Sequence, residues 1–378
     1  MFVTVPQSQL AAALRVVGRA VVARSSLLVT GHVLLATKPG KLKLAATNMD
    51  LAIVTIVDAE VREEGAMSVP ARTFTDLVGS LPDTPIELRR GKTPDLAITA
   101  PRFAATTKGL DAAEFPAIDA PGAEVRYAVA AQHLRQAIDD VIFAAARDQT
   151  RPQLSGLLLR AHGDTLTLVG CDGFRLSVRQ LPLTQPVPDA TPDLIVPRTT
   201  MAEVARGFGA LDGPVTVAST PTGGQVVFMA PTLQFVSRLI DGTYVDFDRV
   251  LQQTEQHDVT IAAATADVQH AAHFTQIVAR DADNHVRIDA TPGANGTLVF
   301  QATAAQVGDN STEVAARIEG TSAKLALDNT YLADVLGAIR TDRLVIRAKA
   351  GAVQPVLLRP EPDGDARHVI MPIVLSAK

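Results

Sequence analysis

The chain contains one segment three times, at intervals close to a third of its length. The segment "MSVPARTFTDLVGSLP" (67–82) returns as "LIVPRTTMAEVARGFG" (194–209) and, more faintly, as "LALDNTYLADVLGAI" (325–339). Self-similarity at a fixed period indicates repeated structural units. A chain of 378 residues also exceeds what one hydrophobic core usually organises. Three domains of about 125 residues each are near the usual domain size.

Two further patterns recur with the same period. An extended stretch followed by an amphipathic helix opens each third, in residues 2–21, 126–146 and 259–279. The dipeptide Ala100-Pro101 of the first third returns as Ala230-Pro231 in the second. These agreements predict three similar domains, with boundaries at residues 1–122, 123–252 and 253–378.

Each third is predicted to have an α+β fold, with two helices and antiparallel sheets. In the first third, strand-like alternation changes twice to apolar residues three and four apart, which indicates helices near 8–21 and 73–81. A Pro39-Gly40 dipeptide separates two strand-like runs within residues 32–61, as a hairpin turn does. Helices this short leave too little surface to cover both faces of a sheet.

The first predicted helix combines an apolar stripe with a cationic face. On a helical wheel, Arg15 and Arg19 lie opposite the stripe. The first 50 residues carry six cationic side chains and one acid, although the whole chain has a net charge of -5. This polarised charge favours a polyanionic partner, and a simply hydrated helix face is the alternative. The stripe consists of Leu10, Leu14, Val17 and Val21.

The sequence lacks the motifs that most enzyme classes need. It has no phosphate-binding glycine loop ending in Lys-Ser or Lys-Thr, no helical histidine pair and no Gly-x-Ser-x-Gly elbow. Cys171 lies beside Asp172, whose charge would raise the pKa of the thiol and weaken it as a nucleophile. The acidic pairs Asp139-Asp140 and Glu63-Glu64 have polar neighbours typical of a solvated surface. We therefore expect no catalytic residue, no metal and no cofactor.

Targeting signals are also missing from the pattern. The first residues, "MFVTVPQSQL", do not combine a basic region with an apolar run, and no 18 apolar residues follow one another anywhere. One cysteine is compatible with a reducing compartment. We expect a cytoplasmic protein.

Five segments are more specific than the repeat itself. They are "VPARTFTDLVGSLP" (69–82), "VGCDGFRLSV" (169–178), "SRLIDGTYVDFDRVL" (237–251), "NTYLADVLGAI" (329–339) and "HVIMPIVL" (368–375). In this order and at this spacing, they resemble the bacterial DNA sliding clamp family, the beta subunit of DNA polymerase III. The resemblance extends over all three thirds.

The resemblance implies a head-to-tail homodimer that forms a closed ring, with helices lining the hole and sheets outside. Duplex DNA would pass through the hole without sequence preference, and the ring would tether the replicative polymerase. A net charge of -5 fits this better than binding by affinity alone, which usually needs a strongly basic domain. The protein would act at the nucleoid as a processivity factor and not as an enzyme. DNA-facing cations are expected at Arg15, Arg19, Arg24, Arg72, Arg147 and Arg198.

A second implied site is an apolar pocket that receives short motifs from polymerases, the clamp loader and repair proteins. The C-terminal run is almost entirely apolar, so it either completes a strand or lines a groove. Phe174 and Val245 stand where the family often has histidine and proline. The matching pocket walls are Leu154, Cys171, Gly173, Phe174, Arg175, Leu176, Val245, Arg249, Val250, Val369, Ile370, Met371, Pro372, Ile373 and Leu375.

For the seam of the ring, the resemblance pairs Phe103 of one subunit with Ile277 and Val278 of the other. Such a head-to-tail contact closes only at the right angle per subunit. Two alternatives stay open. An enzyme with an undetected active site would contain a deep pocket with shifted pKa values. A triplicated scaffold that does not bind DNA would have no effect on primer extension.

Overall fold

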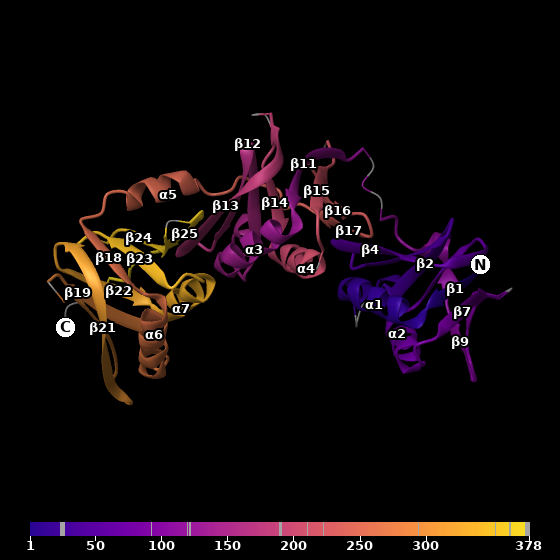
Figure 1. Cartoon of the computed structure of the whole chain (residues 1–378), viewed down its shortest axis with the longest axis horizontal. Coiled ribbons are helices and arrows are strands. Elements are labelled where there is room, and N and C mark those ends of the chain that lie inside the picture. Colours follow the sequence, from indigo (N-terminus) through magenta and orange to yellow (C-terminus); the bar gives the residue numbers. More distant parts are fainter. Residues whose placement is uncertain are drawn as a thin grey trace. The chain divides into compact units, whose positions relative to one another are not determined.

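The computed structural model describes residues 1–22, 27–91, 93–118, 120, 122–188, 191–209, 211–221, 223–293, 295–351, 353–362 and 364–374. Within these ranges the chain forms seven α-helices and three antiparallel sheets (Figure 1). Two compact units result. One unit contains residues 1–132, 183–187 and 202–239, and the other contains residues 133–182, 188–201 and 240–378.

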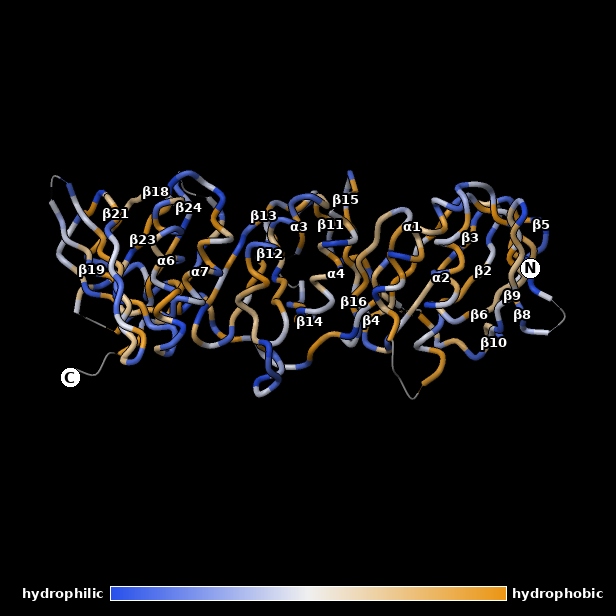
Figure 2. The backbone as a smooth tube through the Cα atoms, turned by 90° about the horizontal axis from the view of Figure 1, so that it is seen from below, coloured by the Kyte–Doolittle hydropathy of each residue, from blue (hydrophilic) through white to orange (hydrophobic). Residues whose placement is uncertain are grey.

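Every third contains the same two transitions from a strand directly into a helix, which confirms the predicted repeat. Hydrophobic stretches, coloured orange in Figure 2, occur in helices and strands of all three thirds. The first transition joins β1 (Phe2–Pro6) to α1 (Gln7–Val17), β11 (Glu124–Ala130) to α3 (Ala131–Val141) and β18 (Val259–Ala264) to α6 (Thr265–Ala279). The second joins β6 (Ala66–Pro70) to α2 (Ala71–Ser80), β14 (Leu194–Pro197) to α4 (Arg198–Phe208) and β22 (Ala323–Asp328) to α7 (Asn329–Ala338).

Helix α1 buries the predicted stripe but is shorter than expected. Leu10, Leu14 and Val17 are fully buried, since residues four and three apart share one helix face. The α-helix ends at Val17 because Gly18, a poor helix former, begins a 3-10 turn. Val21 therefore lies outside the helix and is only partly buried.

The first unit contains two sheets, and the larger one runs from the first third into the second. Gly40 adopts the left-handed conformation (φ 68°) in the predicted turn between β2 (His32–Lys38) and β3 (Lys41–Thr47). Strand β4 (Leu51–Asp58) pairs with β17 (Leu233–Arg238) of the second third, with Ile53 opposite Phe235. The smaller sheet has the order β5 (Glu60–Glu63), β1, β7 (Pro85–Arg90), β8 (Asp95–Ala100), β9 (Phe103–Lys108). The larger has the order β10 (Leu110–Asp111), β6, β2 (His32–Lys38), β3 (Lys41–Thr47), β4 (Leu51–Asp58), β17 (Leu233–Arg238), β16 (Gln225–Ala230), β15 (Pro214–Ser219), β11.

The second unit contains one sheet that runs from the second third into the last. Strand β13 (Arg175–Val187) pairs with β25 (Ala366–Ile370) of the last third, with Leu176 opposite Val369. The two joints between thirds are thus made in the same way, by the second strands of two hairpins. The strand order is β14, β12 (Gly156–Cys171), β13 (Arg175–Val187), β25 (Ala366–Ile370), β24 (Val356–Glu361), β23 (Arg343–Ala348), β18, β21 (Gly308–Gly320), β20 (Thr297–Ala304), β19 (His285–Thr291), β22.

One helix, α5 (Phe247–Thr254), was not predicted. It lies between the second and last thirds, outside the repeated pattern. The side chain of Asp246 starts it by accepting a hydrogen bond from the Arg249 backbone nitrogen at 3.2 Å. Phe247 anchors it, being almost fully buried against the sheet.

The last third starts its second helix differently from the first. Pro70 precedes α2 and offers no side-chain cap. At the equivalent place before α7, Asp328 accepts hydrogen bonds from the backbone nitrogens of Thr330 (2.7 Å) and Tyr331 (3.2 Å). These bonds satisfy two amides that a helix start otherwise leaves without partners.

Removing this cap should destabilise the last third. We expect D328A to lower the free energy of unfolding by about 1 kcal/mol, the usual effect of losing an N-cap. D328N keeps an acceptor oxygen at the same place and should remain within about 0.5 kcal/mol of the unchanged protein. Urea unfolding followed by circular dichroism measures both. Equal losses in the two variants would show that the cap is not the cause.

Candidate functional site

The strand register brings most of the predicted pocket residues together. Leu176 on β13 lies opposite Val369 on β25, and both side chains pack on Cys171 at the end of β12. Leu154 belongs to the same cluster and is fully buried. Val245 and Val250, on either side of the start of α5, pack against it from outside.

Ile370 departs from the predicted pocket wall. Val369 packs in the cluster with Leu176, whereas Ile370 packs in the core of the last third with Phe300 and Leu332. Successive residues of a strand face opposite sides of the sheet, so both cannot line one groove. The structure therefore removes Ile370 from the wall.

The apolar C-terminal run first completes a strand and then follows the edge of the cluster. After β25 ends at Ile370, the Met371 nitrogen donates to the Phe174 carbonyl and the Ile373 nitrogen to the Ala326 carbonyl, both at 2.8 Å. Met371 and Phe174 have exposed side chains, and Pro372 and Ile373 are partly buried. An apolar rim results. Leu375 lies outside the described residues.

The turn before β13 holds Phe174 outward. One carboxylate oxygen of Asp172 accepts from the backbone nitrogens of Phe174 and Arg175, both at 2.9 Å. Gly173 has φ 95°, a backbone conformation that residues with a β-carbon rarely adopt, so the turn favours glycine, and the Arg151 guanidinium lies against it. The Gly173 nitrogen donates to the Cys171 sulfur at 3.3 Å, and burial raises the pKa of that thiol. A reactive thiolate is thereby disfavoured.

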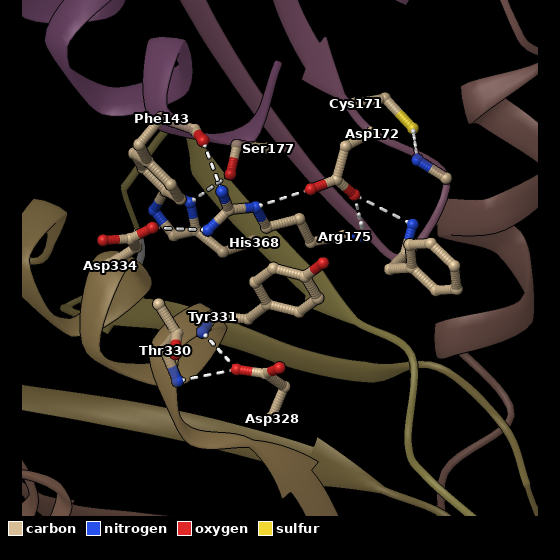
Figure 3. A network of polar contacts seen from close by, with 12 residues as sticks. Phe143, Cys171, Asp172, Arg175, Ser177, Asp328, Thr330, Tyr331, Asp334 and His368 are labelled. Carbon is tan, nitrogen blue, oxygen red and sulfur yellow. Dashed lines mark hydrogen bonds and ion pairs between the residues drawn. The ribbon is translucent and has the colours of Figure 1, made fainter. Parts of the chain in front are cut away.

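Arg175 is buried in a network instead of forming an open wall (Figure 3). Its Nε donates to Asp172 at 3.0 Å, and one terminal nitrogen donates to Asp334 of α7 at 2.6 Å. The other terminal nitrogen donates to the Phe143 carbonyl at 2.7 Å. The Tyr331 ring lies 4.4 Å from the guanidinium carbon, a cation–π contact. Arg175 thus connects the second third to the last.

His368 lies beside this network on β25. It is opposite Ser177 of β13, whose hydroxyl is 3.0 Å from its Nδ1, and its ring lies 5.9 Å from that of Phe143. Burial lowers the pKa of His368 to about 4, because the site offers the charged imidazolium no water. The nearby Arg179 charge acts in the same direction.

Sequence reasoning missed most of this network. Tyr331 and Asp334 lie inside the segment 329–339, which was identified as a family motif, but no role was assigned to them. The pairing of Arg175 with Asp334 crosses 159 positions of sequence. A buried arginine requires partners, which is the one signal that could have prompted the search for carboxylates.

A cavity of about 420 Å³ opens next to the 172–175 turn. Leu154, Phe174 and Tyr331 form apolar parts of its lining, and Arg147 and Arg151 form cationic parts. Arg147 was predicted to face DNA, and the structure places it at this cavity. A cavity of this size can hold one or two side chains of a peptide.

Arg198 also lies near the cavity residues. It is half-buried, and its Nε donates to the Ile142 carbonyl at 3.1 Å. Burial lowers the pKa of Arg198, and the charges of Arg147 and Arg175 lower it further. Arg147 and Arg198 therefore form a cationic group within the second unit.

The remaining predicted DNA contacts lie in the first unit. Arg15 on α1 and Arg72 on α2 are exposed, and the two helices pack together. Arg19 has its Nε 3.8 Å from a carboxylate oxygen of Glu203 on α4, which offsets part of its charge. Arg24 lies outside the described residues.

The predicted seam residues are differently exposed. Phe103 and Ile277 each leave 49% of their surface accessible, which is unusual for large apolar side chains. Phe103 begins β9, the last strand in the order of its sheet. Val278 is buried, in a small cluster with Ala279, Ala302 and Ala304. Ile277 is therefore the exposed member of that pair.

The described residues assemble neither a metal site nor a membrane-spanning helix. In those ranges, no group of three or more His, Cys, Asp or Glu side chains is placed to hold a metal ion. None of the helices described is long and apolar enough to cross a membrane.

Comparison with known proteins covers nearly the whole chain. Residues 1–119, 128–246 and 249–374 match the models of the N-terminal, central and C-terminal domains of the DNA polymerase III beta subunit. The beta sliding clamp of Pseudomonas aeruginosa is 29% identical over 99% of this chain and 100% of its own length. That of Staphylococcus epidermidis is 25% identical over 94% of both chains.

Solved structures agree. The sliding clamp of Pseudomonas aeruginosa bound to griselimycin superposes with a TM-score of 0.92, at 29% identity, covering 99% of this chain and 100% of that one. The griselimycin-bound clamp of Bartonella birtlesii gives 0.90 at 26% identity, with the same coverage.

Three α+β domains joined by continued sheets, with an apolar rim at the second joint, define a sliding clamp, which is a processivity factor and not an enzyme. The chain belongs to the family of the DNA polymerase III beta subunit.

Replacing Arg175 should weaken the joint between the second and last thirds. We expect R175K to lower the free energy of unfolding by about 2 kcal/mol, because one ammonium cannot satisfy two carboxylates and a carbonyl at once. The value allows for Asp334, which is one-third exposed and can regain water. Urea denaturation measures it.

Arg160 provides a matched control. It also bonds two carboxylates, of Asp193 and Asp248, and lies 4.8 Å from the Phe247 ring, but its side chain is 38% exposed. R160K should therefore cost under about 1 kcal/mol. A loss as large as that of R175K would contradict the importance of burial.

Acid should destabilise the joint through His368. Its folded pKa is about 4 and its ordinary value is 6.5, so the unfolded chain binds the proton first as pH falls. Stability should decline between about pH 6.5 and pH 4, by about 3 kcal/mol, and be fully present above pH 6.5. H368Q should flatten this dependence, while H133Q, at an exposed position, should keep it. The midpoints of urea unfolding at pH 5 and pH 7 measure this dependence for each variant. An unchanged pH dependence in H368Q would contradict its assignment to His368.

Proposed function

We propose that two copies of this chain close head to tail into a ring around duplex DNA and slide along it without sequence preference. The observation that carries the proposal is the repeated joint. At both joints, the second strand of one hairpin pairs with the second strand of another: β4 with β17, and β13 with β25. A third pair of equivalent strands remains, β21 and β9.

These two strands have free edges in the described residues. β9 pairs only with β8, and residues 308–315 of β21 pair only with β20. Unpaired strand edges attract other strands. Pairing β21 with β9 of a second copy would repeat the same joint, and the exposed Phe103 and Ile277 would be covered beside it. A dimer would then contain six similar joints.

For the domains we propose the boundaries 1–122, 123–252 and 253–378. The matched ranges 1–119, 128–246 and 249–374 support this division. Helix α5 would close the middle domain and connect it to the last.

For DNA we propose weak phosphate contacts from Arg15, Arg19, Arg24 and Arg72, which fit a chain of net charge -5. Enclosure, and not affinity, would retain such a ring. Arg147 is a weaker candidate because it lies at the cavity beside the 172–175 turn, and Arg198 because it is half-buried against the Ile142 carbonyl. Acidic side chains elsewhere on the chain would repel DNA from the other surfaces.

For partners we propose that the apolar rim, together with Val245 beside it, receives short motifs of the replicative polymerase, the clamp loader and repair proteins. Relatives bound to griselimycin show that such clamps bind a compound. The same work would place the protein in the cytoplasm, at the nucleoid. A triplicated scaffold without DNA is the alternative and would lack any reason for the exposed seam residues.

A single substitution at the seam tests both the dimer and its retention on DNA. I277D introduces a charge at an exposed apolar position of the proposed interface. We therefore expect the variant to sediment as a monomer at micromolar concentration, and the unchanged protein to sediment as a dimer. With clamp loader and ATP, the unchanged protein should remain on nicked circular DNA through gel filtration and leave linear DNA. I277D should dissociate from the circular DNA as well as from the linear DNA.

V353D is the control, since Val353 is also an exposed apolar residue but is distant in sequence from β9 and β21. It should behave like the unchanged protein. Equal retention on linear and circular DNA would contradict enclosure, and a dimeric I277D would contradict the seam.

A further inference from the structure

The cavity beside the 172–175 turn is lined in part by arginines that form no salt bridge in the described residues. Arg147 and Arg151 line it, and Arg198 lies close enough for Arg147 and Arg175 to disfavour its charged form. In the described part of the chain, none of Arg147, Arg151 and Arg198 has a carboxylate oxygen within 4.0 Å of its guanidinium. Arg151 donates only to the Asp172 carbonyl, at 3.3 Å.

The carboxylates of the cavity already have other partners. Asp172 and Asp334 both accept hydrogen bonds from Arg175. Asp148 accepts one from the Thr150 backbone nitrogen at 2.9 Å, which holds its pKa below the ordinary value. Asp172 and Asp334 are thus engaged by Arg175, and Asp148 is influenced by the Arg151 charge, which leaves Arg147 as a lining guanidinium with no hydrogen bond or ion pair in the described residues.

We propose that this cavity binds a carboxylate of the partner peptide, adjacent to the apolar segment that lies on the rim. The inference rests on the proposed partner site and adds the chemistry that selects its ligands. Arg147 is the principal donor, because its side chain is exposed at the cavity and makes no hydrogen bond within the described ranges. Arg151, which is held against Gly173, is the second. Arginine suits carboxylates because its two parallel donors match their two oxygens.

A peptide fits this cavity better than a DNA phosphate. Leu154, Phe174 and Tyr331 supply apolar lining beside the arginines, as a groove for side chains requires. A phosphate track would instead present cations along an open surface. DNA binding by Arg147 is thus the competing outcome of the test.

Binding of labelled peptides tests the proposal. The probes are ten-residue peptides with one common Leu- and Phe-containing centre and Asp, Asn or Lys at either flank, followed by fluorescence anisotropy. At one of the two flanks, the peptide with Asp should bind about three- to tenfold more tightly than the peptide with Asn at the same place. The peptide with Lys there should bind most weakly. Added salt should reduce the difference. R147E should reverse the order of Asp and Lys.

Two controls make failures distinguishable. R287E, on β19 outside this cavity, makes the same charge change and should leave the order unaltered. Griselimycin should displace every peptide, which reports occupancy of the partner site itself. Peptides that griselimycin displaces, but that bind equally with Asp and Lys, would overturn only the carboxylate proposal. Loss of DNA retention in R147E with an unchanged peptide order would assign Arg147 to DNA. If griselimycin displaces no peptide, the partner site fails, and the carboxylate proposal fails with it.

Discussion

Antiparallel pairing of strands from different thirds is the interaction on which the rest depends. Backbone hydrogen bonds form the ladder at both joints, so the geometry does not require particular side chains. The side chains can therefore differ. At the first joint, small apolar residues such as Ala52 and Val236 pack together, whereas the second joint buries Arg175 and His368. The shared backbone preserves the repeat, and the variable side chains allow each joint its own chemistry.

The two joints also share a turn, and its side chains explain why the apolar rim occurs only once. Before β4, Asn48 accepts hydrogen bonds from the backbone nitrogens of Asp50 and Leu51, as Asp172 does before β13. The Asp50 carbonyl accepts from the Arg238 nitrogen, as that of Phe174 does from Met371. Identical backbone thus presents a charged Asp50 and Arg238 at one joint and an apolar Phe174 and Met371 at the other. Only the second can attract an apolar peptide.

The sequence was sufficient for the repeat, the strand-to-helix transitions and the family, because each depends on local pattern or on period. Other features depend on distant partners. Helix α5 lies outside the period, and the bond between Arg175 and Asp334 joins segments with no pattern in common. Ile370 was assigned to the wall through the family motif, and the motif alone does not tell that this side chain packs in the core of the last third. Arg198 was assigned to DNA by its place in the repeat, but the Ile142 carbonyl holds it half-buried.

Several arginines of the chain are engaged by carboxylates or carbonyls of the chain itself and are therefore less available to DNA. Glu203 lies beside Arg19, the Ile142 carbonyl holds Arg198, and Arg175 is enclosed by two carboxylates. For a protein held on DNA by affinity, such pairing would reduce the number of displaced counterions and hence binding. For a ring, retention is topological, so each lost phosphate contact lowers friction without releasing the DNA. Pairing of arginines with acids and carbonyls is therefore compatible with sliding, and it leaves those side chains available to stabilise the joints.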